Sequence, residues 1–277
     1  MLIRGGNTSE QVTNSMKDLY ALKKPNAVMY KRKNIVRPFD DESSLEFFSE
    51  KSDASLFVFG SHSKKRPHNL TIGRMYDMHV LDMVELGIEK FQPLSSFAVA
   101  KCPTGTKPCL VFTGEPFEHD HEYKRLKNMF IDLFRGPVVE NIRLAGLEHV
   151  IMFAAVDGKI LLRSYKILLK KSGTRTPRIE LEEMGPSFDF ALRRTKLASD
   201  DLFKLARKQP KEIKIKKTKN VSQDAFGTKL GRIHMEKQDL SELQTRKMRG
   251  LKRQKPERNA SKISSDNKKA KFKSEEN

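Results

Sequence analysis

The sequence predicts an α/β fold followed by a basic arm, and three observations support that prediction. Between residues 45 and 192, short apolar runs typical of buried strands alternate with amphipathic stretches of helical period. The pair Asp157-Gly158 separates two such runs, which is typical of a two-residue hairpin. Residues 201–277 hold 23 Lys and Arg against 10 Asp and Glu, and so carry +13 of the chain's net +19. We therefore predict an N-terminal extended segment (1–40), a folded domain (41–200) and a basic C-terminal arm (201–277) that is largely extended or disordered.

The first third of the chain is expected to contain two short helices and two strands. The first helix covers residues 12–22, and Pro25 and Pro38 favour an extended chain after it. LEFFSEK follows a pair of acidic residues, which favour the start of a second helix. SLFVFG and LTIGR predict two strands, joined by the polar, basic loop SHSKKRPHN.

The next segment, HVLDMVELGIEKF at residues 79–91, is expected to form a helix. Asp77 would cap its first turn, and Pro93 would end it. Its apolar residues recur at spacings of three and four and so gather on one helical face: Val80, Leu81, Val84, Ile88 and Phe91.

The second half of the domain repeats the order strand, loop and helix. CLVFTG predicts a strand, EPFEHDHE a loop, and residues 123–134 a helix. Two strands then flank Asp157-Gly158, and RIELEEM and FDFALRR alternate as half-buried strands around a Gly185-Pro186 turn. Because both halves combine a strand, a charged loop and an amphipathic helix, we expect a duplicated α/β unit. The residues on the inner face of the second-half helix are Leu126, Met129, Phe130 and Leu133.

The basic arm is expected to hold little regular structure. Residues 201–208 predict a short helix, and KQPKEIKIKKTKN has the composition of a solvated linker. The motif Asp239-Leu240-Ser241-Glu242 resembles a capping box, which would start a helix that ends near Leu251. We expect disorder from Lys252 onward.

Composition narrows the class of protein. No apolar window approaches the length of a membrane span, and the first residues lack the apolar stretch of a signal peptide, so we expect the cytosolic and nuclear side of membranes. Cys102 and Cys109 form neither a disulfide framework nor a four-ligand zinc site, and we interpret them as reduced, inert thiols.

Basic clusters indicate a polyanionic partner, and nucleic acid is the polyanion that we expect. Lys and Arg side chains on loops and strand ends would set the register on a phosphate backbone. Each cluster taken alone also fits an ordinary solvated surface, and the charge does not distinguish RNA from DNA. The clusters within the folded domain are Lys64, Lys65 and Arg66; Lys170, Lys171, Arg175 and Arg178; and Arg193 and Arg194 with Lys196.

The sequence contains few features that indicate an enzyme. There is no Gly-rich phosphate loop, and we interpret His119-Asp120-His121 as part of a solvated acidic loop. An RNA-processing enzyme remains an alternative, and it would require His119 and His121 to converge with a remote carboxylate. A DNA-associated regulator is a second alternative.

Six long segments resemble the Brix-domain family of ribosome assembly proteins. Together they span residues 18 to 252. They are DLYALKKP, RPFDDESSLEFFSEKSDASLFVFGSHSKKRP, IGRMYDMHVLDMVELGIE, FRGPVVENIRLAGLEHV, TPRIELEEMGPS and GRIHMEKQDLSELQTRKMRGLK.

The resemblance implies a Brix domain of two pseudo-symmetric, anticodon-binding-like α/β halves. It implies a nucleolar protein that binds rRNA and is not an enzyme. We expect no cofactor. The member most like these segments forms a heterodimer with the regulator of ribosome synthesis. That pair recruits 5S rRNA and its two ribosomal proteins into the precursor of the large subunit. A nucleolar DNA- or RNA-associated regulatory scaffold is the alternative.

The resemblance also implies particular RNA contacts. In the family, a basic amphipathic helix before the midpoint hairpin contacts RNA, and the matching sequence is YKRLKNMFIDLFRGP. Many members carry Arg after the late Gly-Pro, where this chain has Ser187, and many have a basic helical stretch ahead of the position of Met1, so we expect a shortened form. The implied contacts are Lys124, Arg125, Lys127 and Arg135, and we add from the matched segments Arg143, Arg232, Arg246, Lys247 and Arg249.

Overall fold

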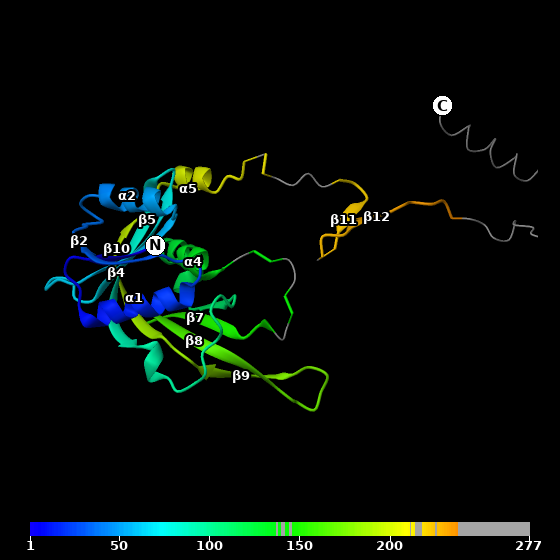
Figure 1. Ribbon diagram of the computed structural model, residues 1–277, viewed down its shortest axis with the longest axis horizontal. Coiled ribbons are helices and arrows are strands. Elements are labelled where there is room, and N and C mark those ends of the chain that lie inside the picture. The colour runs from blue at the N-terminus through cyan, green and yellow to red at the C-terminus, as the bar shows by residue number, and fades with distance from the viewer. Residues whose placement is uncertain are drawn as a thin grey trace, which may run out of the picture. The chain divides into compact units, whose positions relative to one another are not determined.

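The structure is a computed structural model that describes residues 1–136, 138–139, 142–143, 146–210, 212–213, 218–224 and 226–237. The chain divides into two compact units, Met1–Lys216 and Lys217–Asn277. The first unit contains one large sheet with helices on it, and the second contains a small hairpin (Figure 1).

The first unit contains both strands and helices. The second unit holds β11 (Val221–Gln223) and β12 (Lys229–Gly231). The elements of the first unit are β1 (Leu2–Gly5), α1 (Glu10–Lys23), β2 (Met29–Asn34), α2 (Ser43–Ser52), β3 (Leu56–Ser61), β4 (Asn69–Tyr76), β5 (His79–Gln92), the 3₁₀ helix η1 (Leu94–Ser96), β6 (Cys109–Thr113), α3 (Pro116–His119), α4 (His121–Phe134), β7 (His149–Val156), β8 (Lys159–Lys170), β9 (Arg178–Glu183), β10 (Ser187–Lys196) and α5 (Asp200–Ala206).

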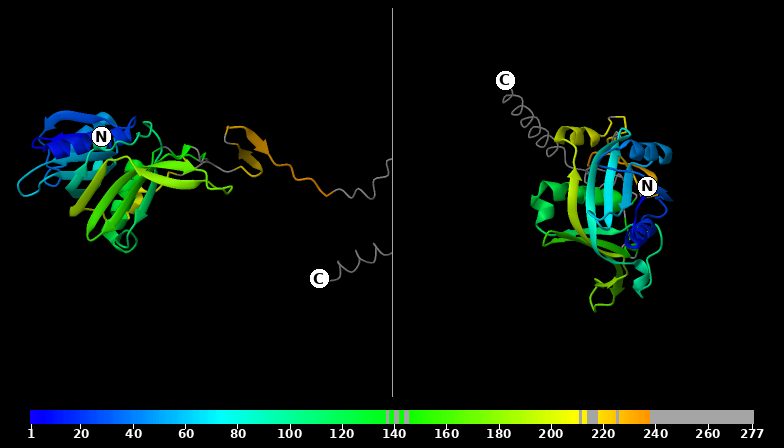
Figure 2. Two further views of the ribbon diagram at one scale, coloured as in Figure 1. Left: turned by 90° about the horizontal axis from the view of Figure 1, so that it is seen from below. Right: turned by 90° about the vertical axis from the view of Figure 1, so that its left-hand side faces the viewer.

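The large sheet consists of two halves with related connectivity. Its strand order is β2-β1-β3-β4-β5-β10-β8-β7-β6, and β9 pairs with β8. In the second half β6 leads through α3 and α4 to the parallel strand β7, whereas in the first half β1 leads through α1 to the edge strand β2 and then through α2 to β3, which is parallel to β1. An antiparallel hairpin follows in each half, and β5 and β10 join the halves in antiparallel pairing (Figure 2). The expected duplicated α/β unit is confirmed.

Helices cover both faces of the first half of the sheet. Alternate residues of a strand point to opposite faces. Val58 on β3 therefore joins a core cluster with residues of α1 and α4, whereas Phe57 and Phe59 join another with Leu45 of α2. Figure 1 shows α1 and α2 on opposite sides of these strands. The larger cluster also takes in Phe153 and Ile160 of the second half, so one core holds both halves together.

The strongest local prediction, the hairpin at Asp157-Gly158, is confirmed. β7 and β8 pair in antiparallel register up to Val156 and Lys159. Asp157 has φ 50° and Gly158 has φ 72°, the positive values that a type I′ turn needs at both central positions. The strands expected at SLFVFG, LTIGR, CLVFTG, RIELEEM and FDFALRR are also confirmed, as are the helices α1, α2, α4 and α5.

The helix predicted at residues 79–91 is wrong, because this segment is strand β5. It pairs with β4 on one side and β10 on the other, and residues 81–88 are all buried. A strand covered on both faces loses the polar alternation that would distinguish it from a helix. Asp77 is not an N-cap. With φ 52°, and with Met78 at φ 64°, it forms a two-residue turn between β4 and β5.

Three further expectations need correction. Residues 1–40 are not a separate extended segment, because β1 and β2 extend the sheet and α1 packs into the core. The loop expected at EPFEHDHE contains α3 and the first residues of α4. The arm contains the β11–β12 hairpin, whereas the helix expected from Asp239 to Leu251 lies outside the described residues.

The buried histidine of β7 makes stability depend on pH. His149 is 4% exposed, and its Nε2 lies 2.8 Å from Ser164 Oγ. Burial lowers the pKa of His149 from 6.5 to about 4. The folded protein therefore keeps this ring neutral at pH values where the unfolded chain protonates it.

We expect the free energy of unfolding to decrease as the pH falls from 6.5 to 4. The contribution of His149 is fully present above pH 6.5, and on the order of 3 kcal/mol is lost toward pH 4. Urea unfolding at pH 7, 5.5 and 4 measures it, with His149→Gln as the non-titrating control. Parallel pH profiles for the two proteins would contradict the assignment.

Candidate nucleic-acid interface

The cations predicted to contact nucleic acid fall into two groups in the structure. One group is exposed on loops and helix surfaces. The other group is bound by carboxylates and aromatic rings of the protein itself. Since a phosphate competes poorly with a buried internal partner, only the first group is free to bind a polyanion.

The β3–β4 loop carries the first exposed cluster. Lys64 and Lys65 are exposed. Arg66 differs, because its Nε lies 3.7 Å from Oε1 of Glu85, whose side chain is 1% exposed. The first two lysines are therefore the freer cations of this loop.

On α4, four neighbouring cations have different environments. Lys124 and Arg135 are exposed. The Nζ of Lys127, which is half-buried, lies 5.5 Å from the ring centre of Phe112. Arg125 is 4% exposed and is not available to RNA in this structure. The helix thus presents its two ends, rather than the whole basic sequence, to solvent.

Arg125 belongs to an internal network beneath α4. Its Nη2 donates to Asp200 Oδ1 at 2.9 Å, and its guanidinium carbon lies 3.4 Å from the ring centre of Phe203. The hydrogen bond from Arg125 lowers the pKa of Asp200. Its Nη1 lies 3.8 Å from Asp82 Oδ2. These contacts attach α5 to the core, a role that was not predicted for Arg125.

Arg74, which was not among the predicted site residues, occupies the same network. Its Nε donates to Asp82 Oδ2 at 2.9 Å, and its Nη1 donates to Asp132 Oδ2 at 2.9 Å. Asn128 Oδ1 accepts a further bond from Nη1 at 2.7 Å. A buried guanidinium needs such complete pairing. Asp82 comes from the next strand, whereas Asp132 lies 58 residues away in the sequence.

Arg193 and Arg194 on β10 are also engaged within the protein. Arg193 donates to Asn69 Oδ1 and to the Pro67 carbonyl, both at 2.9 Å. Arg194 donates to buried Glu85 and stacks on Phe39, with 3.9 Å between its guanidinium carbon and the ring centre. We therefore assign these two residues a structural role, in contrast to the expected phosphate contact.

The β8–β9 tip holds the third predicted cluster. Lys170 and Arg178 both pair with Glu180, whose hydrogen bonds raise the pKa of each. Lys171 and Arg175 are exposed. Because an exposed ion pair contributes little stability, all four cations remain at the surface of the tip.

The remaining predicted contacts lie elsewhere. Arg143 is exposed between α4 and β7, and Arg232 is exposed in the second unit. Arg246, Lys247 and Arg249 fall outside the described residues. The predicted contacts did not include a further short basic cluster, Lys31-Arg32-Lys33, which is exposed on β2 at the edge of the sheet. Its three consecutive basic residues were the sequence feature that could have identified it as a candidate contact.

Asp120 and His121, two of the residues considered for a catalytic site, make structural contacts instead. Asp120 caps α4 by accepting from the backbone N of Glu122 at 2.9 Å. His121 Nε2 lies 3.6 Å from Asp200 Oδ1. Within the described ranges, no three His, Cys, Asp or Glu side chains gather in a way that could hold a metal ion. No described helix has both the length and the apolar character to span a membrane.

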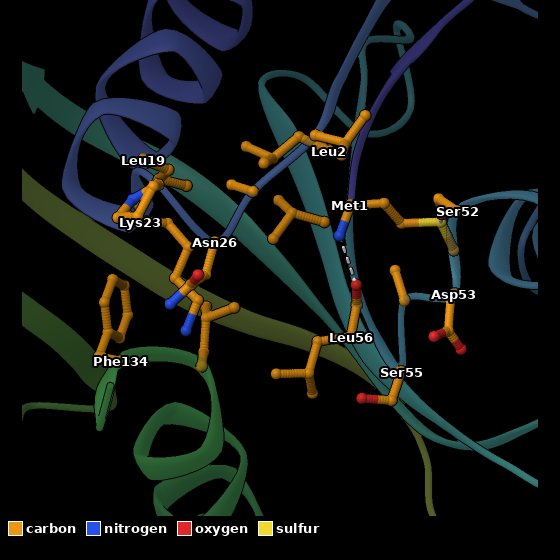
Figure 3. A pocket seen from close by; sticks show the side chains of 16 residues that line it. Met1, Leu2, Leu19, Lys23, Asn26, Ser52, Asp53, Ser55, Leu56 and Phe134 are labelled. Carbon is orange, nitrogen blue, oxygen red and sulfur yellow. Dashed lines mark hydrogen bonds between the residues drawn. The ribbon is translucent and has the colours of Figure 1, made fainter. Parts of the chain in front are cut away.

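A cavity of about 400 Å³ lies between α1, β3 and the end of α4 (Figure 3). Its wall is mainly apolar and includes Leu19, Leu56 and Phe134. In its wall the N-terminal amino group of Met1 donates to the Leu56 carbonyl at 2.7 Å. Lys23 and Asp53 are its charged side chains, and burial lowers the pKa of Lys23.

Comparison with known proteins gives consistent matches over most of the chain. The family model described as Brix domain matches residues 5–194, which include α1, β2 and the last residue of β1. The chain is 65% identical over 232 residues to the Mus musculus protein named "Ribosome production factor 2 homolog", covering 84% of this chain and 76% of that protein. For the Homo sapiens protein of that name the identity is 66% over 231 residues, covering 83% and 76%. The Saccharomyces cerevisiae "Ribosome biogenesis protein RPF2" is 44% identical over 264 residues, covering 91% and 77%.

The neighbours Lys124 and Arg125 provide a sharp test of the two groups of cations. Arg125→Ala removes a buried guanidinium that faces Asp82 and Asp200, so we expect a loss of on the order of 3 kcal/mol in the free energy of unfolding. Lys124→Ala, one residue earlier and exposed, should change it by less than about 0.5 kcal/mol. Urea denaturation of both variants measures the difference. Equal losses would show that Arg125 is not anchored as described.

Proposed function

We propose a function for this chain, which belongs to the Brix-domain family and within it to the ribosome production factor 2 homologues. The proposed function is that of a non-catalytic assembly factor that binds rRNA. It helps to recruit the 5S ribonucleoprotein into the precursor of the large ribosomal subunit and so supports maturation of the large-subunit rRNA. The observation that carries the proposal is the identity to relatives named as ribosome production or biogenesis factors across most of the chain.

The surface charge supports an RNA partner. Lys64, Lys65, Lys124 and Arg135 are exposed cations on elements of one packed unit. Double-stranded RNA offers little base information to side chains, so recognition by backbone shape and phosphate contacts suits such a surface. The β3–β4 loop and the β8–β9 tip belong to different halves of the sheet, which favours contacts along an extended RNA over a single binding pocket.

The acids next to the basic groups favour binding over catalysis. Asp82 and Glu85 are 0% and 1% exposed, and both hold arginine side chains in place. Asp200 holds Arg125. Carboxylates that are used in this way are poorly placed to move protons on a bound RNA.

We extend the proposal to partners and location. The regulator of ribosome synthesis is the proposed heterodimer partner, and 5S rRNA with its two ribosomal proteins is the proposed cargo. The arm of residues 201–277 is proposed to bind large-subunit rRNA in the pre-60S particle, as basic segments do. The proposed location is the nucleolus.

The salt dependence of 5S rRNA binding tests the electrostatic part. Each neutralised phosphate should contribute a slope of about 0.7–0.9 in log affinity against log salt. Replacing Lys64, Lys65, Lys124 and Arg135 together by Gln should lower the slope by about 3. Fluorescence anisotropy with labelled 5S rRNA, with the partner factor present, measures both slopes.

Lys159→Gln is the matched control, because Lys159 is exposed but pairs with Glu89 and is not a proposed contact. An unchanged slope in the fourfold variant would contradict the proposed surface. Equal competition by duplex DNA at physiological salt would favour the DNA-associated scaffold instead.

Truncation separates the arm from the core. Deleting residues 217–277 should leave the Tm of the first unit unchanged and weaken 5S rRNA binding. Deleting residues 201–277 should also lower the Tm, because it removes Phe203 from Arg125. Differential scanning calorimetry of both proteins measures the effect, and an equal Tm for the two would contradict the structural role of α5.

A further inference from the structure

A second hollow, of about 510 Å³, lies where β4, α4 and α5 meet. That volume is within the range that binds small organic ligands. Arg74 contributes from β4, Arg135 from the end of α4, and Arg207 from the residue that follows α5. Three guanidinium groups from separate elements therefore converge on one space.

Two of these three cations carry uncompensated charge. Arg74 is neutralised by Asp82 and Asp132. Arg135 and Arg207 are exposed, and neither has an ion-pair partner among the described residues. The guanidinium of Arg207 lies 5.3 Å from the Phe203 ring centre, a contact that leaves its hydrogen-bond donors free. Among the charged side chains that line the hollow, the three cations Arg74, Arg135 and Arg207 outnumber the one acid, Asp132.

The neighbouring cavity places a further cation, Lys23, within electrostatic reach of Arg135. Ser55 and Leu56 line both spaces, and Lys23 lines the first of them (Figure 3). The pKa of Lys23 is lowered, first by burial and then by the positive charge of Arg135. An anion bound near Arg135 would relieve this repulsion.

The rest of the lining suits more than a bare anion. Leu56, Met75 and Leu81 give apolar surface, and Tyr76 and Phe203 contribute aromatic rings. Planar bases pack well on such side chains, while guanidinium groups bind phosphate. A ligand with a flat apolar part and a phosphate matches both features.

We propose that this hollow binds a single nucleotide of an unpaired RNA segment, with the phosphate at Arg135 and Arg207 and the base against the apolar and aromatic wall. The inference rests on the proposed function and deepens it, because it assigns one unpaired nucleotide to a defined place. The base enters a space bounded by α5, so the site exists only while α5 is packed on the core.

Two variants of the full-length chain test the site. One fills the hollow without changing its charge, and the other removes a positive charge. Ala206 lines the hollow, so Ala206→Phe fills it without changing the charge. Arg207→Gln removes one cation and adds no bulk. Leu205→Phe is the matched control, because Leu205 is 52% exposed on the same helix and does not line the hollow.

The probe is a fluorescein-labelled twelve-nucleotide single-stranded RNA, measured by anisotropy, with AMP as competitor. Loss of one charge-assisted phosphate contact should weaken binding about tenfold. We expect that loss for Ala206→Phe and for Arg207→Gln, a change below about twofold for Leu205→Phe, and displacement of the probe from the wild type by AMP. If Ala206→Phe lowers the Tm, Arg207→Gln alone decides.

The outcomes separate this site from the wider function. Wild-type affinity for the probe in both variants, with 5S rRNA still bound, would overturn the hollow as a nucleotide site and leave the proposed function standing. Binding of the probe that AMP and both variants weaken, with 5S rRNA ignored, would support the site and overturn the proposed function. Displacement by hexaglutamate but not by AMP would overturn the nucleotide assignment in favour of an acidic peptide.

Discussion

The central constraint of the structure is the burial of the middle of β5, residues 81–88, between β4 and β10. Residues 81–88 are covered on both faces, and two of them, Asp82 and Glu85, are acids. A buried carboxylate is tolerated only with close partners. Asp82 therefore binds Arg74 and lies near Arg125, and its Oδ1 accepts from the backbone of Ala198 at 2.7 Å. Glu85 binds Arg194, and Asn69 donates to it at 2.5 Å. The two acids of this one strand thus hold Arg74, Arg125 and Arg194 in contacts within the protein.

Local signals predicted much of the fold, whereas β5 depends on contacts that are distant in the sequence. The turn at Asp157-Gly158 follows from two residues whose backbone preferences suffice. For residues 79–91, helical spacing and a buried strand give the same apolar pattern, and only the pairing with β10, about 100 residues later, distinguishes them. Gly87 is informative in retrospect, because a Cβ there would lie 2.3 Å from Arg193 Nε. A glycine inside a strand often marks such a close approach.

The same constraint explains why the candidate site was predicted only in part. Counting Lys and Arg finds the basic clusters but does not show which charges are already bound within the protein. Lys124 and Arg125 are adjacent in sequence and alike in charge, yet one is exposed and the other is 4% exposed against Phe203. The difference arises from the side of α4 on which each lies and from the position of Asp82 on β5. The helical period of a single sequence predicts the side of α4 on which each residue lies. It does not predict that Asp82 of β5 lies next to that side.

The network beneath α4 also determines how the basic arm leaves the core. Asp200 and Phe203 hold α5 against Arg125, so the first residues of the arm are part of the packed unit. Arg207 follows directly and lines the hollow with Arg135. A tethered segment acts at a high effective concentration near its anchor. An RNA strand held at the hollow would therefore meet the rest of the arm without a second diffusive encounter. Under the proposed function, Arg125 would support RNA binding without touching RNA, because it fixes the point from which Arg207 extends.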